Sequence, residues 1–519
     1  MMAGSEWLRQ TRRTYFGNAA AQRDFRVQLR GNRSMLLFGL YLAILITVAY
    51  FKYGEIANNA TISVVQAQRE LRDFYTLIVS LLAGMVAIVT PGLAATTIVM
   101  ERQRRSLDLV FSAPVAPRYY LVGKIIAVYR YIWMLLILSL PVTAACVVLG
   151  GASWSDVLTV YGMLSVHGLL FAAIGLLMST VSSKPVAAVV WTYIAVAGYL
   201  FASTGAGAAY SYRPMMAGGE VPFIVGLSPF SAIFTVGTYT PLYGYHVPNY
   251  LLASLAILVG VRLCLLGAGS ILSEGRETAN LRIHWMLLAA ACSFGFCYWL
   301  VTEGGYSGMA TNTSFGSSDP HAAVLGYGLF WVMTPLVLAL PTLAAYGEDG
   351  YIRQRVNGWF DVRHTFDGTP AGAMPYIVLV ILSTSVAALG GIAAAGGNLP
   401  SALFAVYVVY AMGFWGLFWA IARVASSYGI GLKAARTAVV ASVVLLIALP
   451  VPFLSAVSAQ SLGREESAAW DFYLLRPVLM FNHYRPEIAI GYGLGLVAVA
   501  LGLNSWSEWN RKRLAVASA

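Results

Sequence analysis

The chain has 519 residues, of which 59% are hydrophobic and only 11% are charged, and its mean hydropathy is +0.71. This composition excludes a soluble multidomain protein, because a soluble chain cannot bury so much apolar surface. The net charge of +11 does not by itself indicate nucleic acid, since membrane proteins retain Lys and Arg in their cytoplasmic loops. We therefore expect an all-α, polytopic membrane protein that binds lipid and no nucleic acid.

The first 34 residues contain seven arginines and no apolar run of signal-peptide length. This predicts a cytoplasmic amino terminus without a cleaved export signal. Beyond them, apolar runs recur that can cross about 30 Å of hydrocarbon as helices. We expect about twelve spans, at 35–51, 74–99, 121–149, 156–180, 185–203, 247–270, 285–302, 322–345, 372–395, 401–424, 437–456 and 486–505.

With this layout most Lys and Arg residues lie on one side, which predicts that both termini are cytoplasmic, in a plasma or bacterial inner membrane. Arg130 and Arg262 fall near the cytoplasmic ends of their spans, where snorkelling to the headgroups competes with a role in a translocation path. His167 lies deeper, and we expect it to bond to another helix instead of relaying protons. The four cysteines all fall inside spans and predict packing, without a disulfide or metal site; they are Cys146, Cys264, Cys292 and Cys297.

A short basic stretch, ERQRRSLDLVFSAPVAPRYYLVGK (Glu101–Lys124), interrupts the apolar runs. Its first part, from Glu101 to about Ser112, is compatible with a helix about 18 Å long. On that helix one face is apolar by i, i+3, i+4 and i+7 spacing, and two prolines then end it. Such a helix either transmits force to the neighbouring spans or rests on lipid headgroups, and the apolar face comprises Leu107, Val110, Phe111 and Pro114.

Aromatic residues are dense in the external loop at about 204–246. The apolar segment FIVGLSPFSAIF within it is too short to cross a membrane. Four of its residues have α-helical spacing, which predicts either a segment at the outer leaflet or an ordinary packed loop; they are Phe223, Leu227, Phe230 and Phe234.

Three pairs of landmarks repeat at nearly constant spacing along the chain. Glu101 and Glu348 are separated by 247 residues, Lys184 and Lys433 by 249, and the prolines of LSPF and LRPV by 248. This regularity predicts two tandem halves of six helices each, at about 1–274 and 275–519.

No catalytic constellation is visible in the sequence. A GxxxxGK[ST] motif, an HExxH motif and a paired carboxylate site are all missing, so we expect no catalytic, cofactor-binding or metal-binding residues. A secondary transporter driven by an ion gradient is the alternative, but it needs an ionisable group near the membrane midplane and no span offers a clear carboxylate. A third possibility, an intramembrane enzyme that acts on lipid, would need convergent catalytic residues, and we find none in the sequence.

The basic stretch resembles the signature of type-2 ABC exporter permeases, E-x-E-x-G-T-L-x-x-L-L-x-x-P-x-S/P-R followed by L-G-K. The residues that match are Glu101, Leu107, Pro114, Arg118, Gly123 and Lys124, whereas Gln103, Arg105 and Ser106 replace Glu, Gly and Thr. The segment Asn18–Ser34, with Arg23, Arg26 and Arg30, is similar to the interfacial helix that precedes the first span in that family. LSPFSAI, which includes Pro229, resembles the segment before its sixth span.

The resemblance implies a permease whose coupling helix docks on separate ABC ATPase subunits, with two copies expected. ATP and Mg²⁺ would then bind in the partner, and the cargo stays unknown. In the second half, the region around Glu348 and Ile352 is basic but lacks the S-x-P core. The two ATPase contacts are therefore expected to be unequal.

Overall fold

A computed structural model describes residues 19–29, 32–58, 64–107, 117–211, 223–242, 245–273, 278–302, 361–366, 372–394, most of 408–424, and 486–517. The chain forms two compact units, Met1–Leu272 and Ser273–Ala519. The described residues are mostly helical, in agreement with the expected class. Two six-helix repeats stay a prediction, because residues 303–360 and 425–485 lie outside the described part.

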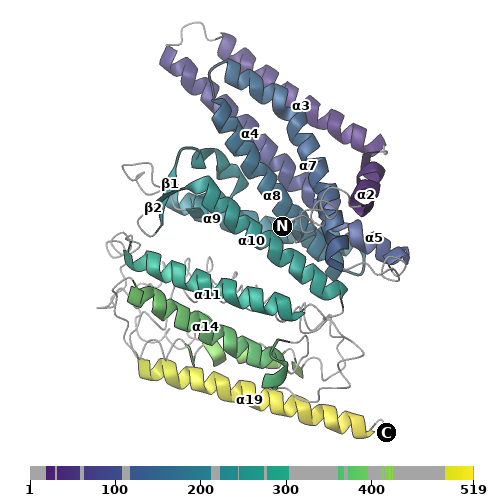
Figure 1. Ribbon diagram of the computed structural model, residues 1–519, viewed down its shortest axis with the longest axis vertical. Helices are drawn as coiled ribbons and strands as arrows, with labels where there is room; N and C mark the ends of the chain where they lie inside the picture. Colours follow the sequence, from purple (N-terminus) through teal and green to yellow (C-terminus); the bar gives the residue numbers. More distant parts are fainter. Residues whose placement is uncertain are drawn as a thin grey trace, which may run out of the picture. The chain divides into compact units, whose positions relative to one another are not determined.

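In the first unit, one short helix precedes a series of long apolar helices (Figure 1). The long helices α4, α7 and α8 pack against one another, and α10 packs along α8. The elements are α2 (Ala19–Leu29), α3 (Asn32–Asn58), α4 (Val64–Ala95), α5 (Thr97–Gln103), α7 (Pro117–Val148), α8 (Trp154–Val181), α9 (Pro185–Ser211) and α10 (Asn249–Leu272).

Local sequence signals set the turn between α7 and α8. After α7, Gly150 adopts a left-handed backbone with φ of 86°, a conformation that glycine adopts without steric cost. Ser153 then begins α8 with a capping box: its hydroxyl accepts from the backbone N–H of Asp156, and the Asp156 carboxylate accepts from the N–H of Ser153. These reciprocal bonds satisfy donors that a helix start leaves open.

A continuous apolar core joins α3, α4, α7 and α8. It includes Leu45, Leu82, Ile132 and Phe171, all of which are almost fully buried. Close helix approach depends on Gly175 in α8, where an added Cβ would lie 2.8 Å from the Cβ of Ala94 and 3.0 Å from the carbonyl oxygen of Pro91. Glycine therefore allows α8 to pack tightly against the proline-containing part of α4.

Five helices in the described residues are long and apolar enough to cross a membrane. They cover five of the predicted spans, and the part of the chain the structure describes also holds shorter apolar helices at Phe38–Lys52, Pro185–Phe201 and Ala411–Ile421. The predicted spans 322–345 and 437–456 lie outside the described residues. The five helices are Gln68–Gln103, Pro117–Val148, Trp154–Val181, Asn249–Leu272 and Met374–Ala394.

The segment between α9 and α10, which we call the external segment after its expected side of the membrane, differs from the α-helical spacing that the sequence suggested. It forms two 3-10 helices, η1 (Phe223–Leu227) and η2 (Pro229–Thr235). Ser228, in extended conformation, separates them before Pro229, because proline has no N–H to continue a hydrogen-bonded ladder. An unexpected antiparallel hairpin follows, made of β1 (Tyr239–Leu242) and β2 (Tyr245–Pro248).

In the second unit, α11 (Thr278–Thr302) packs closely against α14 (Ala373–Ala394). Arg282 near the start of α11 is buried; its guanidinium donates to the carbonyl oxygen of Thr365 at 2.7 Å and lies 5.2 Å from the Tyr376 ring centroid. The unit also contains η3 (Val362–His364) and the long helix α19 (Pro486–Ala517). Only residues 486–505 of α19 were expected to be helical.

Candidate functional site

The sequence-predicted coupling region begins at α5, whose start is capped by another helix. Thr96 provides no side-chain cap. Instead, the hydroxyl oxygen of Ser179 on α8 accepts from the backbone N–H groups of Ile98 at 3.1 Å and Val99 at 3.0 Å. Since the first N–H groups of a helix have no partner within that helix, Ser179 ties the start of α5 to α8.

Arg102 makes the reciprocal contact from α5 to the carboxyl end of α8. Its guanidinium donates to the carbonyl oxygens of Thr180 at 3.0 Å and Ser182 at 3.2 Å. These carbonyls lie at the negative end of the α8 dipole, where a cation is favourable. The two helix ends therefore stabilise each other, although Arg102 was not among the expected site residues.

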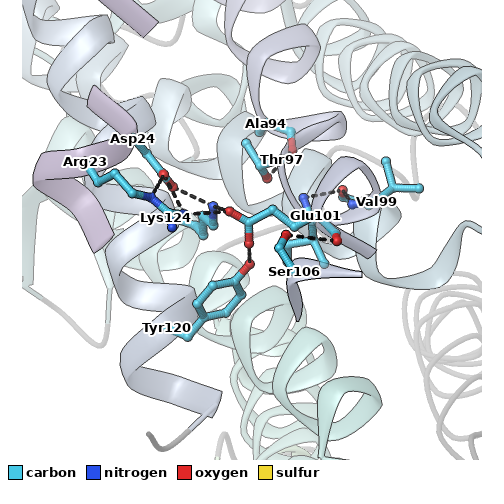
Figure 2. A network of polar contacts seen from close by, with 11 residues as sticks. Arg23, Asp24, Ala94, Thr97, Val99, Glu101, Ser106, Tyr120 and Lys124 are labelled. Atoms are coloured by element: carbon cyan, nitrogen blue, oxygen red, sulfur yellow. Dashed lines mark hydrogen bonds and ion pairs between the residues drawn. The ribbon is translucent and has the colours of Figure 1, made fainter. Parts of the chain in front are cut away.

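Four charged side chains and one tyrosine from α2, α5 and α7 meet beside this junction and form what we call the ion cluster: Arg23, Asp24, Glu101, Tyr120 and Lys124 (Figure 2). One carboxylate oxygen of Glu101 lies 2.7 Å from Arg23 Nη2 and 2.7 Å from Lys124 Nζ. The other oxygen accepts from the Tyr120 hydroxyl. Lys124 also lies 2.5 Å from Asp24, and Arg23 lies 3.1 Å from Asp24.

The two acids and two bases of the ion cluster balance in formal charge. The side chain of Lys124 is only 3% exposed, and those of Asp24 and Glu101 are 15% and 16% exposed. A buried ammonium without partners would cost several kcal/mol, so its two carboxylates are necessary. Burial would lower the pKa of Arg23, but the negative charges and hydrogen bonds of Asp24 and Glu101 outweigh it and raise that pKa.

The predicted helix from Glu101 to about Ser112 is interrupted by a turn, helical structure resumes at Ser106 and Leu107, and residues 108–112 lie outside the described part. Helix α5 ends at Gln103, and Arg104 and Arg105 form a turn. Arg105 has a left-handed φ of 54°, at the position where the type-2 permease pattern has glycine. The Ser106 hydroxyl donates to the Glu101 carbonyl oxygen at 3.1 Å and supports this turn.

Leu107 also differs from its expected role as a docking residue. It is 7% exposed and packs with Ile98, Tyr120 and Leu176 inside the unit. It therefore anchors the turn to the helices, whereas Gln103, Arg104, Arg105 and Arg118 are exposed. Val110, Phe111 and Pro114 lie outside the described residues, as do Glu348 and Ile352 of the second unit.

The amino-terminal helix α2 packs along α7. Arg26 is exposed there, and Arg30 lies outside the described residues. Asp24, which sequence reasoning did not single out, faces Lys124. The sequence could have indicated Asp24, because it is the sole acid of a basic segment. Lys124, at the start of an apolar span, needs such a counter-charge.

At the other end of the unit, polar side chains converge on the external segment. The backbone carbonyl oxygen of Leu227 lies 3.1 Å from Nε2 of His167 on α8 and accepts a 2.5 Å bond from the Tyr199 hydroxyl on α9. His167 was expected to bond to another helix, and its partner outside α8 lies in the 3-10 helix η1. Leu227 and Phe230 pack against the core, Pro229 is buried, and the side chains of Phe223 and Phe234 lie outside the description.

Neither protein-family models nor curated protein sequences match this chain. Within the described ranges, no group of three His, Cys, Asp or Glu residues could hold a metal ion. The fold defines the class of the chain as a helical protein whose described residues include five helices long and apolar enough to span a membrane. Any finer functional assignment depends on the geometry of its own residues.

Proposed function

We propose that the chain is the permease of an ABC exporter, which couples ATP hydrolysis by separate subunits to movement of its membrane helices. The observation that carries the proposal is the ion pair between Glu101 and Lys124, at 2.7 Å. These two residues match the ends of the motif that resembles type-2 permeases. Their contact, together with Asp24, binds the start of the basic stretch to α2 and α7.

The geometry supports mechanical transmission from the cytoplasmic end. Helix α5 follows α4 after a single residue, Ser179 and Arg102 tie it to α8, and the ion cluster ties it to α2 and α7. Because these bonds hold both ends of α5, a force on the turn after Gln103 is shared by several membrane helices. A partner that moves this turn would therefore shift these helices together, and such a shift could alternate access to a substrate path from one side of the membrane to the other.

The exposed residues of the turn define the chemistry of the proposed contact. Arg104 and Arg105 are exposed beside the ion cluster, and Arg118 is exposed at the start of α7. This basic surface suits an acidic surface on an ATPase, and it also suits anionic headgroups, at about 1 kcal/mol for each basic residue. A protein partner and a lipid surface therefore predict different results when these charges are reversed.

The test reverses the charges without disturbing buried residues. We expect Arg104→Glu with Arg105→Glu to abolish co-purification of an ABC ATPase expressed from a neighbouring gene. Substrate-stimulated ATP hydrolysis in membranes that contain both proteins should fall at least tenfold. Leu107→Asp would be a poorer probe, because burying a carboxylate among apolar side chains would unfold the unit.

The matched control is Arg69→Glu with Arg72→Glu, which reverses two exposed arginines near the other end of α4. This control should keep the ATPase bound. Retention of the ATPase by both double variants, equal loss from both, or transport by the chain alone would refute the proposal.

A further inference from the structure

The external segment, η1 and η2 (223–235), lies between α8 and α9 on one side and α10 on the other. On one side, the Leu227 carbonyl meets His167 and Tyr199. On the other side, Gly226 approaches α10 so closely that an added Cβ would lie 2.6 Å from Asn249 Oδ1 and 2.7 Å from the Cβ of Ala253. The segment thus fills the outer end of the bundle formed by α8, α9 and α10.

His167 is unusual because both of its ring nitrogens face carbonyl oxygens. Nδ1 lies 2.8 Å from the Met163 oxygen in its own helix, and Nε2 lies 3.1 Å from the Leu227 oxygen. A neutral imidazole carries one N–H, so it can donate to only one of these oxygens at a time. The ring is fully buried, where the neutral form is favoured over the charged form.

We propose that His167 is a positioning residue that latches the external segment, and that it exchanges tautomers when the segment opens. With the proton on Nε2, the ring bonds to Leu227 and holds the segment in place. When the segment leaves, the ring takes a proton from water at Nδ1, gives the Nε2 proton to water and bonds to Met163 instead. The imidazole is neutral in both end states and keeps one hydrogen bond in each.

This two-partner arrangement explains why a histidine suits the position. When the segment opens, Nδ1 of the ring can donate to Met163 within α8, whereas an amide placed to reach only Leu227 would lose its partner in the protein. The ring avoids that loss because its second acceptor is always within reach. Tyr199 has no second acceptor of this kind in the contacts described, so its bond contributes to closure alone.

The tautomer proposal predicts different results for two variants that carry the same amide group. His167→Gln places its donor near the position of Nε2 and should still reach Leu227. His167→Asn places its donor near the position of Nδ1 and should reach only Met163. We therefore expect the Gln variant to keep the latch and the Asn variant to lose it.

Hydrogen–deuterium exchange of the full-length protein in lipid nanodiscs measures the latch directly. In peptides covering 223–235, exchange should rise about fivefold in His167→Asn, the factor that corresponds to one lost hydrogen bond of about 1 kcal/mol. His167→Gln should stay within about twofold of the parent, and Tyr199→Phe, which removes a single hydroxyl, should raise exchange in the same peptides. The control is Ser165→Ala, which removes a bond to Gly162 inside α8 and should leave this segment unchanged.

Equal exchange in the Asn and Gln variants would overturn the proposal, as would a rise spread over all helices. A second measurement uses the parent protein. ¹⁵N spectra of histidine-labelled protein should show the Nε2–H tautomer for His167. The His167 signals are assigned by their loss in His167→Gln. The Nδ1–H tautomer in the resting protein would also overturn it.

The role of this latch as a gate for cargo depends on the proposed exporter function, but the exchange experiment does not. If the latch results hold and no ATPase associates with the chain, the latch stands and the exporter proposal fails. If an ATPase associates and the exchange results are negative, the exporter proposal stands and the latch proposal fails.

Discussion

The two ends of the first unit are held by different chemistry. At the end expected to face the cytoplasm, which we call the inner end, the ion cluster joins three helices through four charged groups and a tyrosine, with Lys124 almost completely buried between two carboxylates. At the opposite end, which we call the outer end, two neutral donors on α8 and α9 meet one backbone carbonyl of the external segment. Breaking a buried ion pair costs several kcal/mol, whereas a neutral hydrogen bond contributes about 1 kcal/mol. The inner end is therefore held more strongly than the outer end, which suits the proposed joint movement of the helices at one end and the proposed opening of the segment at the other.

The largest expected effect on stability follows from removing the buried ammonium of Lys124. Lys124→Met leaves Glu101 and Asp24 largely buried with only the partly exposed Arg23 as counter-charge, and we expect a loss of about 3–5 kcal/mol in the free energy of unfolding. Thermal unfolding of the purified protein in detergent measures it. Lys184→Met is the control, since Lys184 is exposed between α8 and α9. A loss no greater than that of the control would mean that the inner end is not rigid for the reason given.

A smaller effect is expected where α8 packs tightly against α4. Gly175→Ala forces a methyl group against Ala94 and the backbone of Pro91 and should cost about 1–3 kcal/mol. Gly162→Ala in the same helix is the matched control, because nothing lies within 4 Å of its added Cβ. That change should instead stabilise the helix by about 0.5–1 kcal/mol. Opposite shifts of the melting temperature are expected, and shifts of the same sign would contradict the difference in packing.

The smallest effect concerns the exposed turn after α5. Arg105 has a left-handed backbone, which costs a non-glycine residue about 1–2 kcal/mol. Arg105→Gly removes this strain but adds freedom to the unfolded chain, so we expect a net gain of about 0.5–1 kcal/mol. Arg104→Gly, at an ordinary φ of −79°, should be destabilising by a similar amount. If both changes destabilise the protein equally, the strain at Arg105 is not significant.

Much of the fold could be predicted because its signals are local. The apolar runs gave the positions of α7, α8, α9, α10 and α14 to within a few residues, except that α9 continues to Ser211. The predictions were least accurate where helices continue beyond the apolar run. Helix α3 continues past its expected span to Asn58, and α4 begins before its expected span, at Val64. Hydropathy marks the part of a helix that suits lipid, whereas polar residues can continue the same helix into water.

The candidate site was predicted in part. Glu101 and Lys124 were identified through the resemblance, and the structure brings them together. Leu107 was assigned to the docking face because helical spacing was extended through Arg104 and Arg105, where the chain actually turns. Arg102, Tyr120 and Asp24 were missed, because side-chain partners on other helices leave no periodic pattern in the sequence.

The sequence by itself determined the class of the protein and its expected orientation, because hydrophobic length and the placement of Lys and Arg are properties of contiguous residues. Only the tertiary structure decided which polar groups meet. Lys124 reaches Asp24 across 100 residues of sequence, and His167 reaches Leu227 across 60. In a nearly continuous apolar environment, a polar side chain contacts whichever acceptor the packing of the helices brings to it, and that packing depends on close approaches such as Gly175 against Pro91 and Gly226 against Ala253.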